Sequence, residues 1–93
     1  MDNLFYLSPV DGRKSFYNKA AVVRTGEELT LLSYGTPVLH FDGKRTFTRL
    51  WSGYSVTTMR HINAFMSYCG FRHYGGKAWW NTMETDSPID LLY

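Results

Sequence analysis

The hydrophobic pattern of this chain changes its period once, at Ser52-Gly53-Tyr54, and that change fixes the order of its secondary structure. Before it, residues 20–51 are rich in β-branched and aromatic residues, interrupted at short intervals by turn residues, which is typical of consecutive strands. After it, residues 56–69 place apolar side chains at positions i, i+3, i+7 and i+10, the spacing of one helix face. The chain therefore predicts strands first and one main helix second.

Turn signals divide the strand region into a meander. Thr25-Gly26 ends the first apolar run, Gly35-Thr36-Pro37 interrupts the next, and Asp42-Gly43 is the strongest hairpin signal in the chain. Because proline cannot donate to a central ladder, Pro37 predicts a bulge or a strand start. We expect an α+β fold: an antiparallel β-meander of three to four strands, with one main helix packed on it and a short C-terminal helix.

A chain of 93 residues has room for one domain, so we expect residues 1–93 to fold as a single unit. Ser55 is a suitable N-cap for the main helix, and Gly70 stands where a residue just after the helix belongs. The expected parts are an irregular N-terminal segment (1–19), a β-meander (20–51), a main helix (55–69), a short helix (76–83) and an acidic and apolar tail (84–93).

Positive charge is concentrated in the body of the chain. All ten Lys and Arg residues lie between positions 11 and 80, whereas positions 81–93 hold three acidic residues and no basic one. A basic body with acidic ends fits a polyanionic partner, and it also fits an ordinary solvated surface. The distribution excludes a highly acidic mimic of DNA.

The single cysteine, Cys69, cannot form an intramolecular disulfide, and its place on the apolar stripe of the helix predicts a buried, unreactive thiol. The first seven residues carry an early acid and no basic segment, which is not the pattern of a signal peptide. No run approaches 18 apolar residues, so no membrane-spanning helix is expected. These features together predict a cytoplasmic protein.

Several runs of the sequence resemble those of one protein family. The most specific is Trp-Ser-Gly-Tyr-Ser-x-Thr-Thr-x-Arg-His-Ile, which begins at Trp51, and the others lie at 14–20, 33–38 and 76–80. Together they resemble a family of small uncharacterised proteins from Firmicutes, their phages and mobile elements. The family has no known activity, so the resemblance implies a phage or mobile-element origin and no mechanism. Many short proteins of that origin bind host defence machinery, as anti-CRISPR inhibitors do.

The start of the predicted helix carries a dense set of polar groups. Ser55, Thr57 and Thr58 offer hydroxyls beside the free N–H groups of the first turn, and Arg60 lies one turn after Thr57. These groups could hold a phosphate or a carboxylate, or they could do no more than cap the helix. No glycine-rich phosphate loop accompanies them, which argues against a nucleotide-hydrolysing site.

His61 lies on one flank of the same helix, where its ring either packs against the sheet or donates to a phosphate or an acidic partner. A zinc site is not expected: Cys69 and His73 have the spacing of half a site, but His61 is two helical turns from Cys69. No pair of carboxylates and no Ser-His-Asp signature stands out. We therefore expect no enzyme, no metal and no cofactor.

Aromatic side chains alternate with cations in the C-terminal half, and aromatic residues make up 17% of the chain. They could complete a small core, form a protein interface, or stack on the bases of a nucleic acid. The residues expected to bind a partner are Arg60, His61, Arg72, Lys77, Trp79 and Trp80.

These observations favour a non-enzymatic binding module of phage or mobile-element origin. Its expected partner is a host protein or nucleoprotein, such as a CRISPR effector. One alternative is a nucleic-acid-binding regulator that contacts backbone phosphates, and another is a small hydrolase or nucleotide binder centred on Ser55–His61. An exposed sheet edge could also pair with a second copy, so a homodimer is one expected arrangement.

Overall fold

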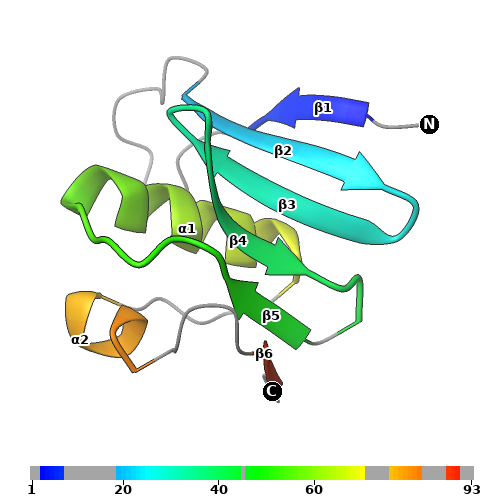
Figure 1. Ribbon diagram of the computed structural model, residues 1–93. Coiled ribbons are helices and arrows are strands. Elements are labelled where there is room, and N and C mark those ends of the chain that lie inside the picture. The colour runs from blue at the N-terminus through cyan, green and yellow to red at the C-terminus, as the bar shows by residue number, and fades with distance from the viewer. Residues whose placement is uncertain (1–2, 8–18, 45, 71–75, 83–87, 91–93) are drawn as a thin grey trace.

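A computed structural model describes residues 3–7, 19–44, 46–70, 76–82 and 88–90, which form an antiparallel sheet with a helix across one of its faces (Figure 1). In these residues the sheet has six strands, and their spatial order follows the order of the chain. The elements are β1 Asn3–Tyr6, β2 Ala20–Thr25, β3 Glu28–Ser33, β4 Thr36–Phe41, β5 Thr46–Arg49, α1 Val56–Tyr68, α2 Lys77–Trp80 and β6 Pro88–Asp90.

The α+β class, the main helix and the short helix are confirmed, but three to four strands are too few. β1 lies inside the segment expected to be irregular, and β6 lies inside the expected tail. Phe5 of β1 pairs with Val22, and Ile89 of β6 pairs with Phe47. Runs of four and three residues are too short for an alternating period to be recognised, so only pairing with a longer neighbour reveals them.

A tight turn joins β3 to β4. Ser33 pairs with Thr36, which leaves Tyr34 and Gly35 as the two turn residues, with φ angles of 52° and 80°. Positive φ at both positions is the type I′ geometry that suits the twist of a hairpin. Gly35 adopts it freely, but a left-handed conformation costs a residue such as tyrosine about 1 kcal/mol or more. Tyr34 is the one non-glycine residue with positive φ in the described part of the chain.

The expected bulge or strand start at Gly35-Thr36-Pro37 is found one residue to either side of Pro37. β4 begins at Thr36, and Pro37 pairs with Leu32 next to a shift in register. Because Leu39 pairs with Leu31, Val38 is the extra residue of the bulge.

The sheet has one covered face and one open face. Along β3, Leu29, Leu31 and Ser33 are buried, whereas Thr30 and Leu32 between them are only half-buried, so alternate side chains point to opposite faces. α1 lies across the face that carries Leu31 (Figure 1). The core between the sheet and the helices consists of Val22, Leu29, Leu31, Val38, Leu39, Phe41, Phe47, Met59, Ile62, Phe65, Met66 and Trp80.

Gly43 is expected to be the least replaceable of the turn glycines. Its φ is 88°, and a Cβ atom at this position would collide with the backbone carbonyl of Glu27 in the neighbouring hairpin turn. Gly35 has a similar φ but open space around it. We expect Gly43→Ala to lower the free energy of unfolding by more than about 2 kcal/mol and Gly35→Ala by about 1 kcal/mol, measured by urea denaturation. Equal losses would show that the two turns do not meet as described.

Candidate functional site

Ser55 closes the N-terminus of α1, as the sequence predicts. Its backbone is extended, its Oγ accepts a hydrogen bond from the Thr58 N–H at 3.0 Å, and its carbonyl accepts from the Met59 N–H at 2.9 Å. The cap therefore uses one of the N–H groups that an anion would need. This first turn is an ordinary capped helix start, with no further feature that indicates a bound anion.

Thr58 and His61 meet the sheet in a buried chain of hydrogen bonds. The Ser33 Oγ lies 3.0 Å from the Thr58 Oγ1 and 2.7 Å from the His61 Nδ1. All three side chains are at most 4% exposed. A serine within hydrogen-bond reach of a histidine is the arrangement of a nucleophile and its base, but burial seals this pair from any substrate. Sequence reasoning missed the pair because Ser33 and His61 lie 28 residues apart on different elements.

Burial and the neighbouring Arg60 together lower the pKa of His61 from 6.5 to about 4. The imidazole is therefore neutral at pH 7, since removing it from water and placing it near a cation both disfavour the charged form. A neutral, enclosed ring cannot act as a cation for a phosphate. The structure supports the packing interpretation of His61.

This low pKa predicts that stability falls as the pH is lowered from about 6.5 to about 4. In that range the unfolded chain binds a proton at His61 and the folded chain does not, so protonation favours unfolding. The contribution is fully present above pH 6.5, and we expect about 3 kcal/mol to be lost by pH 4. Urea denaturation at stepped pH values measures it, with His61→Gln as the non-titrating control. Identical pH profiles for the two proteins would contradict the buried neutral histidine.

A buried arginine organises the segment between β5 and α1. Arg49 is 4% exposed, and its guanidinium donates to the carbonyls of Trp51, Ser52, Gly53 and Trp80 at 2.7–3.0 Å. Desolvation lowers the pKa of Arg49, as expected for a charge removed from water. The side chain thus ties the loop before α1 to the end of α2.

Trp80 completes this arrangement. Its ring is fully buried, its Nε1 donates to the Gly53 carbonyl at 2.7 Å, and the Arg49 guanidinium lies 4.2 Å from its ring centroid. A tryptophan in such a position anchors α2 to the core. Its side chain is not available to contact a partner.

Two of the six residues expected to bind a partner are buried. His61 and Trp80 lie in the interior, which corrects their expected place at an interface. Arg60 is half-buried on α1, and Arg72 lies outside the described residues. Lys77 is exposed, with its Nζ 5.7 Å from the centroid of the Tyr54 ring, and Trp79 is half-buried against the core.

The four residues of the possible anion site lie at the start of α1, but some of their hydrogen-bond donors are already engaged within the protein. They are Ser55, Thr57, Thr58 and Arg60. The Thr58 hydroxyl is buried and hydrogen-bonded to Ser33, and its N–H is capped. Thr57 and Arg60 are half-buried. The turn therefore offers an anion fewer donors than the sequence indicates.

Three of the five large hydrophobic residues that are exposed in the described part of the chain line one hollow on the open face. Leu4, Tyr6 and Tyr34 are 55%, 52% and 58% exposed. Together with Lys19 and Leu32 they line a shallow hollow of about 350 Å³. We call the three residues Leu4, Tyr6 and Tyr34 the open-face patch. Further along this face the surface becomes polar, where the His40 Nε2 lies 2.9 Å from a Glu28 carboxylate oxygen.

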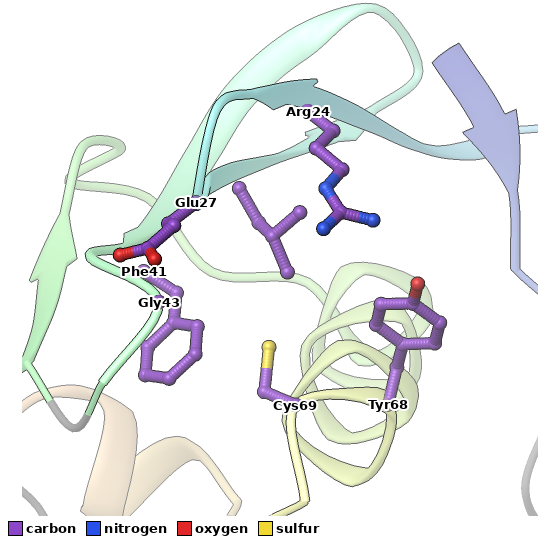
Figure 2. Close-up of a pocket in the computed structure, with 7 residues that line it drawn as sticks. Arg24, Glu27, Phe41, Gly43, Tyr68 and Cys69 are labelled. Carbon is purple, nitrogen blue, oxygen red and sulfur yellow. The ribbon is translucent and has the colours of Figure 1, made fainter. Parts of the chain in front are cut away.

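A second hollow, of about 490 Å³, lies on the covered side between two hairpin turns and the C-terminal end of α1 (Figure 2). Its lining includes Arg24, Glu27, Phe41, Tyr68 and Cys69. Cys69 is half-buried and not buried as expected, but desolvation raises the pKa of its thiol to about 12, which agrees with the expected unreactive cysteine.

In the described part of the chain, no group of three or more His, Cys, Asp or Glu side chains is placed to hold a metal ion. None of the described helices is long and apolar enough to cross a membrane.

The comparison with known proteins gives one match. The model of a family of unknown function, DUF8033, matches residues 6–82. No curated protein matches the chain, and no solved structure matches it. The match agrees with a resemblance to an uncharacterised family and adds no activity to it.

Proposed function

Because the chain belongs to DUF8033, a family of unknown function, no activity follows from membership, and we propose that it is a non-enzymatic binding module. Its contact surface is the open face of the sheet at β1, β2 and the β3–β4 turn. The observation that carries the proposal is the open-face patch, whose three residues are each more than half exposed and line one hollow.

Exposed apolar residues scattered singly need no explanation, but a group of them on one face indicates an interaction surface. Leu4, Tyr6 and Tyr34 line the same hollow although they come from two distant parts of the chain. Tyrosine is enriched where proteins meet, because its ring buries much area while its hydroxyl remains satisfied by water or by a partner.

Tyr34 adds an independent argument. Its left-handed backbone is unfavourable for tyrosine, and Asn-Gly would fit the same turn better. Tyr34 lies at the end of the β3–β4 hairpin, where it lines the hollow and its ring centroid lies 5.6 Å from that of His61. Tyr34 is nevertheless 58% exposed, so packing does not explain a tyrosine at this turn position. We attribute its presence there to recognition, since local sequence and fold disagree most often at functional positions.

A protein partner fits this face better than a nucleic acid. Lys19 is the one cation among the described residues that line the hollow, whereas binding to backbone phosphates needs several. The partner is therefore a protein with a complementary apolar patch. The resemblance to proteins of phages and mobile elements makes host defence proteins, including CRISPR effectors, the first partners to test.

The test compares charged substitutions on and off the open face. Tagged wild type, Leu4→Glu, Tyr6→Glu and the control Val56→Glu are used to capture proteins from an extract of the native host. Val56 is the most suitable control because it is 70% exposed and lies at the start of α1. We expect a partner whose capture falls about tenfold or more with either open-face variant and is unchanged with Val56→Glu.

Three results would contradict this assignment. Capture that is equal for all variants would exclude the open face. Loss with Arg60→Glu or Lys77→Glu, but not with Tyr6→Glu, would place the surface on the helices. Binding to nucleic acid with a steep dependence on salt concentration would support the phosphate-contacting alternative instead.

A further inference from the structure

The hollow on the covered side of the sheet has the volume of a small-molecule site and a mainly polar, open rim. Its volume of about 490 Å³ lies within the usual range for ligand pockets. It opens between the β2–β3 and β4–β5 turns and the last turn of α1 (Figure 2). It lies on the opposite side of the sheet from the open-face patch, so it is independent of the proposed function.

Two hydrogen-bond donors lie on one side of this hollow. Figure 2 shows the Arg24 guanidinium and the Tyr68 hydroxyl on the same side of the hollow, opposite Glu27. Arg24 donates from its Nε to the Gly26 carbonyl at 3.2 Å, which holds the guanidinium in place and leaves its two terminal nitrogens without a hydrogen bond to any other described residue. The Tyr68 ring packs on Phe5 with centroids 5.0 Å apart. A planar guanidinium beside a phenol matches the two oxygens of a carboxylate.

Two apolar side chains form part of the floor of the hollow, whereas its rim is polar. Leu29 and Phe41 are 9% and 4% exposed and form part of its lining. Figure 2 shows the Cys69 sulfur directed into the same space, and a thiol with a pKa of about 12 is uncharged at neutral pH. A short apolar body lying on these side chains would be removed from water on one side only, so its contribution to affinity is small.

The opposite side of the hollow carries a negative charge. The Glu27 carboxylate lies across from Arg24 (Figure 2), and no described residue pairs with it. A second anionic group at that end of a ligand would be repelled. The hollow therefore favours one negative charge at the Arg24 end and none at the Glu27 end.

We propose that this hollow binds a small organic monoanion, a carboxylate with a short apolar body. The carboxylate accepts hydrogen bonds from the Arg24 terminal nitrogens and the Tyr68 hydroxyl, while the apolar body lies on Leu29 and Phe41.

The test titrates the full chain with three probes that differ only in their polar group: 3-phenylpropionate, 3-phenylpropan-1-ol and 3-phenylpropylamine. Amide shifts in ¹H–¹⁵N spectra report the binding position. We expect saturable shifts at Arg24, Leu29 and Cys69 with the acid below about 10 mM, and much weaker shifts with the alcohol and the amine. Ligand-free spectra of each variant establish that it is folded.

Three substitutions resolve the charge requirement. We expect Arg24→Gln to weaken binding of the acid about tenfold or more, because it removes the charge-assisted pair. Glu27→Gln should strengthen binding about threefold by removing a repulsion. Lys19→Gln, which removes a cation from the open face, should change nothing. Equal binding of acid and alcohol, a preference for the amine, no saturable shift, or an unchanged affinity in Arg24→Gln would each overturn the proposal.

Discussion

Replacement of Arg49 by methionine is expected to lower the free energy of unfolding by about 4 kcal/mol. Methionine fills a similar volume but donates no hydrogen bond, so the carbonyls of Trp51, Ser52, Gly53 and Trp80 lose the guanidinium that satisfies them. An unsatisfied buried carbonyl is costly, and the cost is largest at Trp80, whose hydrogen bond to Arg49 is fully buried, whereas the Gly53 carbonyl keeps the Trp80 Nε1 as a second donor. Urea denaturation at pH 7 measures the loss.

Two further variants separate geometry from charge. Arg49→Lys keeps the charge without the fork of donors, and we expect it to lose about half as much stability as Arg49→Met. Arg24→Met removes an exposed guanidinium from the same sheet and should cost less than about 0.5 kcal/mol. A loss below about 1 kcal/mol in Arg49→Met would contradict the role of this side chain as the tie between the loop and α2.

Trp80→Ala is the second large effect, with an expected loss of about 3–5 kcal/mol. The substitution removes a fully buried ring and leaves a cavity in the core cluster. It also removes the Nε1 donor to the Gly53 carbonyl and the ring beneath Arg49. Because the two side chains share these contacts, the losses in Arg49→Met and Trp80→Ala should not add in the double variant.

The neighbouring Trp79→Ala serves as the control for Trp80→Ala. Trp79 has the same side chain on the same short helix but is only half-buried, so we expect a loss of less than about 2 kcal/mol. Similar losses for the two tryptophans, measured in the same urea series, would show that α2 is not oriented as described.

Much of the fold follows from local signals in the sequence. Three local signals agree on the bounds of α1. Ser55 caps its N-terminus, the apolar residues between 59 and 66 have helical spacing, and Gly70, with a positive φ, marks its C-terminal end. Asp42-Gly43 and Pro37 mark a hairpin turn and a bulge for the same reason. The edge strands β1 and β6 could not be found this way, since their short runs become strands only by pairing with β2 and β5.

The candidate sites follow from the sequence only in part. His61 and Trp80 are polar or amphipathic residues in a cation-rich region. The neighbouring sequence does not indicate whether their side chains are buried in the core or exposed to solvent. Their burial depends on partners that are distant in the chain, Ser33 for His61 and Arg49 for Trp80. The open-face patch escapes prediction because it needs β1, and the hollow escapes it because Arg24 and Tyr68 belong to elements whose packing no short-range pattern fixes.

The most direct measurement of the central claim, that the open face is a recognition surface, uses Tyr34→Asn. Asparagine suits the left-handed turn, so stability in urea should stay within about 1 kcal/mol of wild type. Capture of the partner from host extract should nevertheless fall about tenfold or more. Undiminished capture by the folded variant would contradict the claim, and so would a loss of several kcal/mol in stability, because Tyr34 would then be retained for folding alone.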